Sequence, residues 1–156
     1  MNYEELAAQI NQAIAKAAPF RRRQFAESAL AALLNSPELE EIDSSGELNE
    51  AGLAAFHEAR AKFRTATSET VLVWVESIDS GSLCEGNMQP ELLWALIALE
   101  GWSKFLAGNV SGVESIAEQL IDAADYIEPM PPDDALASAE VAAVYERIIS
   151  ALNSAV

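Results

Sequence analysis

The side chains of this chain that could do chemistry are few. It has one histidine, His57, and one cysteine, Cys84. A nucleophilic site needs a base beside the nucleophile, and a transition-metal site needs several His or Cys ligands at set spacings. Neither pattern is present, so we expect no catalytic, cofactor-binding or metal-ligating residue, and no enzyme. We expect His57 to be a surface or boundary residue, and the carboxylate of Glu85 to disfavour a reactive thiolate at Cys84.

Acidic residues recur at helical spacing in segment 111–127 and continue into the proline-rich loop after it. These candidate partner-binding residues are Glu114, Glu118, Asp122, Asp125, Asp133 and Asp134. On a helix the first four lie on one side, where like charges cost roughly 0.2–0.5 kcal/mol per pair. No Lys or Arg lies between Lys104 and Arg147 to offset this repulsion. The surface is either a solvated face or a docking surface for a basic partner.

Arg21, Arg22 and Arg23 form the only basic cluster of the sequence. In the first turn of a helix their charge opposes the helix dipole, so another interaction must offset that cost. Two interpretations stay open: pairing with the protein's own carboxylates, or binding of a phosphate or an acidic partner.

The charge balance limits the classes of partner. The chain has 25 acidic and 9 basic residues, for a net charge of −16, and residues 65–156 hold only two of the bases. Such a protein is repelled by nucleic-acid phosphates and anionic membranes, so we expect neither as a ligand, and a basic protein instead. The longest apolar run, Leu92–Leu99, is too short to span a membrane. With a single cysteine and no secretory-signal pattern, we expect a cytoplasmic location.

The elements that must position these groups are predicted to be helices. The chain has 156 residues, 51% of them apolar, which suits one domain over 1–156. Apolar residues recur at spacings of three and four, with caps and proline stops between the runs. The predicted helices are 3–17, 20–35, 50–63, 69–78, 90–107, 111–127 and one from Asp133 or Asp134 to 152. The expected caps are Asn2 with Glu5, Asn49, Ser68, Ser111 with Glu114, and Asp133 or Asp134.

Segment 70–75, TVLVWV, is ambiguous because alternating β-branched residues are typical of a strand. A lone strand has no partner to satisfy its backbone groups, so we predict a buried helix there. The segment 79–89 is predicted to be a loop, and its function stays open.

The segment 90–107 is apolar on all sides, which is typical of a central helix. We predict an all-α bundle of about six or seven helices around it, with Gly101 at a close helix contact. Aromatic residues at this spacing are more often core than ligand site. We therefore expect core positions for Trp74, Trp94, Trp102, Phe105 and Tyr126.

In size, acidity and helical character the chain resembles the small, acidic, all-helical immunity proteins of bacterial toxin–immunity systems. Segments Glu91–Asn109 and Ser115–Ile127 also look like the helical core of several bacterial families. This resemblance implies a non-enzymatic protein that binds a toxin and occludes its active site.

The leading hypothesis is therefore an immunity or antitoxin-type protein that binds a basic toxin domain through its acidic surface. The first alternative is a self-associating structural or adaptor protein that forms a homodimer. The second is a small-molecule or lipid pocket between helices, lined by Trp94, Trp102 and Phe105.

Overall fold

A computed structural model describes residues 1–84 and 86–153, and over these residues the chain is all-α. Its seven helices are α1 (Tyr3–Lys16), α2 (Pro19–Leu34), α3 (Glu50–Lys62), α4 (Ser68–Ser80), α5 (Pro90–Leu106), α6 (Ser111–Ile127) and α7 (Ala139–Asn153). Short 3-10 turns lie at Pro37–Leu39, Ile42–Ser44, Phe63–Thr65 and Ala135–Ala137. The predicted fold class is confirmed, and so are the approximate bounds of the first six helices. The last helix begins at Ala139, later than the start predicted at Asp133 or Asp134.

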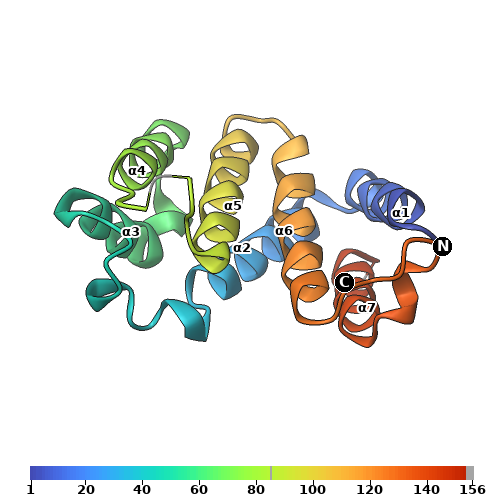
Figure 1. The fold of residues 1–156 in the computed structure, drawn as a ribbon. Coiled ribbons are helices and arrows are strands. Elements are labelled where there is room, and N and C mark those ends of the chain that lie inside the picture. Colours follow the sequence, from blue (N-terminus) through green and yellow to red (C-terminus); the bar gives the residue numbers. More distant parts are fainter. Residues whose placement is uncertain (85, 154–156) are drawn as a thin grey trace.

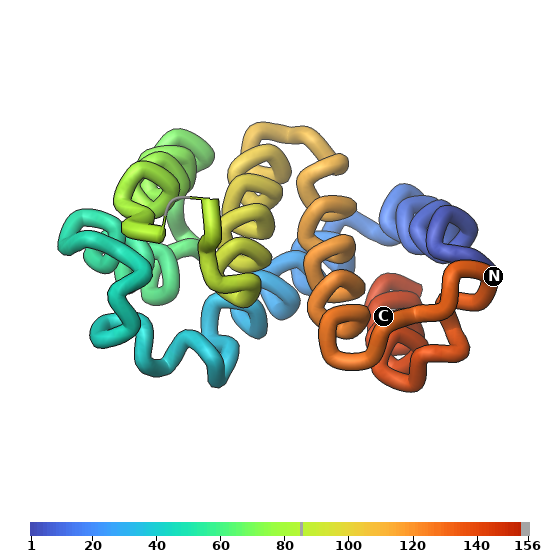
Figure 2. The backbone as a smooth tube through the Cα atoms, viewed as in Figure 1, coloured from blue at the N-terminus to red at the C-terminus, as the bar shows by residue number. Residues whose placement is uncertain are grey.

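The helices α3, α4, α5 and α6 pack one after another across the molecule, and α1 and α7 lie together beyond α6 (Figure 1). Helix α2 runs behind α5 and α6 and reaches α7, so it joins the two ends, as the backbone tube shows (Figure 2). Buried apolar side chains from all seven helices form one core.

Helix α5 lies at the centre of this arrangement, against α2, α4 and α6. It is not buried on all sides, however, because Leu93 and Ile97 point outward with 42% and 36% exposure. The apolar residues of this segment therefore pack on three neighbouring helices, and the fourth side of α5 is exposed to solvent.

Segment 70–75 is helical, as predicted, and lies inside α4 with Val71, Trp74 and Val75 buried. The cap differs from the expectation: the Thr67 side chain accepts the Thr70 amide, 3.2 Å away. Ser68 instead donates from its hydroxyl to the carbonyl oxygen of Ser103, at 2.8 Å, and so ties α4 to α5.

The capping box of Asn2 and Glu5 is present, and Asn49 caps α3, but two other predicted caps are wrong. Ser111 is the first residue of α6, and the box with Glu114 does not form; the Asn109 side chain accepts the Ser111 amide. Neither Asp133 nor Asp134 caps α7, because the turn Ala135–Ala137 intervenes. The Ser138 hydroxyl accepts the Val141 amide there, at 3.3 Å.

Within the arginine cluster, Arg22 has partners that differ from both interpretations, whereas Arg23 fits the first of them. The Arg22 guanidinium donates to the carbonyl oxygens at the end of α1, those of Ile14, Ala15 and Ala17, at 3.0–3.2 Å. These carbonyls form the negative end of the α1 dipole, which offsets the cost of a cation at the start of α2. Arg23 does pair with a carboxylate, that of Glu27, at 3.0 Å.

A second arginine donates to a carbonyl group at the end of a helix in the same way. Arg60 of α3 donates through Nε and Nη2 to the Leu34 carbonyl oxygen at the end of α2, at 3.1 and 3.0 Å. Its guanidinium also lies over the Phe56 ring, 4.7 Å from the centroid. Two of the basic side chains therefore hold helix ends in place.

We expect Arg22→Ala to lower the free energy of unfolding by about 1–2 kcal/mol, because it leaves partly buried carbonyl groups without a donor. Arg21→Ala removes the same charge but only surface contacts, a hydrogen bond to Gln24 and a cation–π contact with the exposed Phe20 ring, so it serves as the matched control. Urea unfolding of both variants measures the difference, and equal losses would show that Arg22 contributes only charge.

The contact between α5 and α6 depends on two glycines, as predicted for Gly101. A Cβ atom added at Gly112 would lie 2.0 Å from the Gly101 carbonyl oxygen, and one at Gly101 would lie 2.6 Å from that of Gly112. The two backbones therefore touch directly at this level.

We expect Gly112→Ala to destabilise the fold by about 2 kcal/mol or more, because α5 and α6 must move apart to admit the methyl group. At a helix position without such a contact, the same substitution would raise the free energy of unfolding by up to about 1 kcal/mol. The sign of the measured change therefore distinguishes the two cases. Thermal or urea unfolding measures it, and a gain in stability would refute the close contact.

Candidate functional site: an acidic groove between α1 and α6

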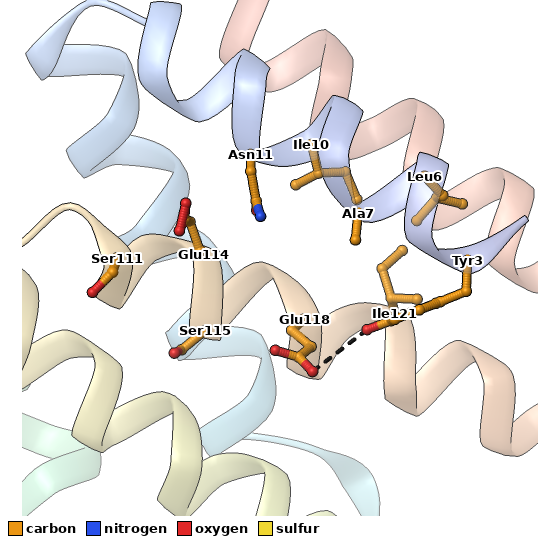
Figure 3. A pocket seen from close by; sticks show the side chains of 10 residues that line it. All are labelled: Tyr3, Leu6, Ala7, Ile10, Asn11, Ser111, Glu114, Ser115, Glu118 and Ile121. Carbon is orange, nitrogen blue, oxygen red and sulfur yellow. Dashed lines mark hydrogen bonds between the residues drawn. The ribbon is translucent and has the colours of Figure 1, made fainter.

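A groove of about 350 Å³ separates α1 from α6 (Figure 3). Its apolar floor consists of Leu6 and Ile10 from α1 and Ile121 from α6. Glu114 and Glu118 line the α6 wall, and Asn11 reaches toward the gap from α1. The groove therefore combines an aliphatic floor with carboxylates on one wall.

The placement of these carboxylates follows from how α6 packs. The helix buries Val113, Ala117 and Ala124 in the core and holds Gly112 against α5. The positions left over are those of Glu114 and Glu118, which are one turn apart and face α1. The spacing that the sequence shows thus becomes a row of carboxylates along one edge of the groove.

Three carboxylates and a phenol lie together at the end of the groove near the start of α1. The Tyr3 hydroxyl donates to Oε1 of Glu118 at 3.4 Å. Burial and the neighbouring carboxylates of Glu118, Asp122 and Asp125 raise the pKa of Tyr3 to about 12. Tyr3 therefore remains a neutral donor near neutral pH.

Asp122 is half-buried beside two other acids. Burial, followed by the charges of Glu118 and Asp125, raises its pKa to about 6. Within the described residues, no Lys or Arg side chain forms a salt bridge with any of these three carboxylates. Their mutual repulsion is therefore not offset by a neighbouring cation.

The structure divides the six predicted acidic residues into two groups. Glu114 and Glu118 line the groove, and Asp122 and Asp125 continue along the same side of α6. Asp125 is also structural, since its Oδ1 accepts the Met130 amide at 2.8 Å.

The other two residues are not part of the groove lining. Asp133 is exposed in the loop, and Asp134 lies 3.5 Å from the amino nitrogen of Met1. We therefore omit both from the site.

Sequence reasoning missed the α1 wall. Tyr3, Leu6 and Ile10 belong to the apolar stripe that predicted α1, but a stripe does not tell which helix it will face. Asn11 carries no signal at all, because an exposed amide on a helix is common.

The isolated histidine and cysteine behave as predicted. His57 is 42% exposed, and its Nε2 lies 2.6 Å from Oδ1 of Asp43. Burial raises the pKa of the Cys84 thiol, and the Glu47 carboxylate raises it further. Glu47 is one carboxylate that acts on the thiol. The predicted effect of Glu85 stays a prediction, because that residue lies outside the described residues.

The aromatic residues do not form the predicted shared pocket. Trp102 is fully buried, packs edge-to-face on Phe63 and donates from Nε1 to the Phe63 carbonyl oxygen at 3.0 Å. Trp94 instead contacts Tyr126 at a separate groove. The core positions of Trp74 and Trp102 are confirmed, whereas that of Tyr126 is wrong because its side chain is 63% exposed.

Among residues 1–84 and 86–153, neither a metal-binding cluster nor a membrane-spanning helix is present. No cluster of three or more His, Cys, Asp or Glu side chains there is arranged to hold a metal ion. No helix in the same ranges combines the length and apolarity needed to cross a membrane.

Comparisons of the chain with protein-family models, with curated proteins and with solved structures found no significant match. The function must therefore be argued from the groove itself.

We expect Asp122→Asn to stabilise the fold at pH 7.5 by about 1 kcal/mol, after allowing for solvent screening of this half-exposed group. A raised pKa means that the folded state disfavours the ionised carboxyl, so wild-type stability falls as pH rises through about 6. The advantage of the variant should therefore shrink below pH 6 and vanish near pH 4. Urea unfolding across this range measures it.

Asp133→Asn is the matched control, because it removes one negative charge from an exposed loop position. If it stabilises the protein as much as Asp122→Asn does, the gain comes from net charge and not from the groove.

Proposed function

We propose that this chain is a non-enzymatic, cytoplasmic protein-binding module of the immunity or antitoxin type, which binds a basic partner through the groove between α1 and α6. The observation that supports it best is the row of carboxylates Glu114, Glu118 and Asp122 beside an apolar floor. No Lys or Arg in the described part of the chain forms a salt bridge with them. A bound cation would relieve a repulsion that the free protein tolerates at a cost.

The groove suits a lysine or arginine side chain of a partner protein. Such side chains are amphipathic, with a methylene stem and a charged end. The stem would lie over the half-buried Tyr3 and Ala7 of α1 while the charge meets Glu118. An arginine would engage the carboxylate with two hydrogen bonds.

The wider charge distribution supports the same choice of partner. The net charge of −16 is concentrated in residues 65–156, so the field around α6 attracts basic surfaces and speeds their approach. A toxin that acts on nucleic acid carries a basic active site, and covering that site with an acidic surface would block its substrate.

The proposal is tested first by finding the partner. A photo-crosslinking amino acid at Asn11, an exposed position on the groove wall, should capture a basic protein in the native cell. The same probe at Ala54 of α3 should not capture that protein, because α3 lies at the opposite end of the molecule (Figure 1).

The captured partner then allows a quantitative prediction. Replacing Glu114, Glu118 and Asp122 by Gln, Gln and Asn should slow association at low salt about tenfold and reduce its salt dependence. Replacing Glu50, Glu69 and Glu76 of α3 and α4 by Gln removes the same charge at the other end, and should have a much smaller effect. Equal losses in the two triple variants, measured by stopped-flow kinetics, would refute the groove as the binding site.

A further inference from the structure

A second groove, of about 470 Å³, lies where the ends of α2 and α6 meet the beginnings of α5 and α7. Its walls include Leu33, Trp94, Leu120 and Val144. Small side chains at Ala123 and Ala124 leave the space between the larger ones open. Both grooves are lined partly by α6, but no residue lines both of them.

Two of the apolar side chains that line the groove are largely exposed. Tyr126 packs edge-to-face on Trp94, with 5.5 Å between ring centroids, yet is 63% exposed. Ile127 beside it is 69% exposed. A small molecule inside the groove would cover only part of these two side chains, whereas a helix lying across the groove would cover both.

The charged side chains at the rim of the groove indicate the sign of the charge that an occupant should carry. Glu38, Glu91 and Glu140 line the groove together with one base, Arg147. The Ser36 hydroxyl donates to the Glu38 carboxylate and lowers its pKa, so that acid stays ionised. A second copy of this chain would bring another negative rim and a net charge of −16, which opposes self-association at this surface.

We propose that this groove is a second docking site, which takes an amphipathic helix of a partner protein with leucine-like or aromatic residues on one face and Lys or Arg along its edges. The apolar face lies on Trp94, Leu120 and Ile127, and the basic edges meet the glutamates. The interaction is independent of the acidic groove and can be tested without knowing the natural partner.

The probe is a synthetic, fluorescently labelled helical peptide of leucine and lysine, with leucine along one face. It should bind with a saturable dissociation constant that rises about tenfold in Tyr126→Ser and in Ile127→Ser, a loss of about 1.4 kcal/mol each. Both side chains are largely exposed, so the variants keep the fold. Phe20→Ser and Val73→Ser are matched controls, since they remove apolar side chains of similar exposure elsewhere, 67% and 59%, and should change binding less than twofold.

Three outcomes would overturn the proposal. Equal binding to all four variants would mean attraction by net charge alone, and equal binding of a leucine–glutamate peptide would mean that the rim charge is irrelevant. If the mass measured by sedimentation rises with protein concentration, and Ile127→Ser abolishes that rise, the occupant is a second copy of this chain. The triple variant at Glu114, Glu118 and Asp122 should keep its peptide affinity within about threefold, which separates this test from that of the acidic groove.

Discussion

The direct contact of α5 with α6 at Gly101 and Gly112 determines the rest of this structure. Because the two backbones touch, α6 cannot rotate about its own axis without a clash. That orientation sends Val113 and Ala117 into the core and turns Glu114 and Glu118 toward α1. The acidic groove is therefore a consequence of packing between helices, and its carboxylates occupy the positions that packing leaves free.

The electrostatics of the groove reflect a general property of stable helical cores. Like charges on one side of a helix cost little compared with the burial of its apolar stripe, so a fold can carry such a column without local compensation. The repulsion acts most clearly on Asp122, whose pKa is raised because it is half-buried beside Glu118 and Asp125. The same unbalanced charge that slightly weakens the free protein would favour the cationic partner that we propose. Under that proposal, stability and binding place opposite requirements on this surface.

Helix positions and the main core could be predicted from the sequence because they depend on local patterns. The stripe of α1, its box of Asn2 and Glu5, and the glycine contact at Gly101 were all visible in the residues. Features that depend on which helices meet could not be predicted. Carboxylates and an external anion were the two interpretations for the cluster of Arg22, but its partners are carbonyl groups at the end of α1. Tyr126 was assigned to the core although it lies at an open groove. The α1 wall was missed for the same reason.

The two ends of α1 are both fastened. At one end the Arg22 guanidinium holds the last carbonyls of the helix, and at the other the Ala135 amide donates to the Met1 carbonyl oxygen at 2.8 Å. Helix α1, which forms one wall of the groove, is therefore held at both ends, and these contacts fix the width of the opening in the free protein. A receptor site built in advance loses little conformational entropy on association, so more of the contact energy is available as affinity.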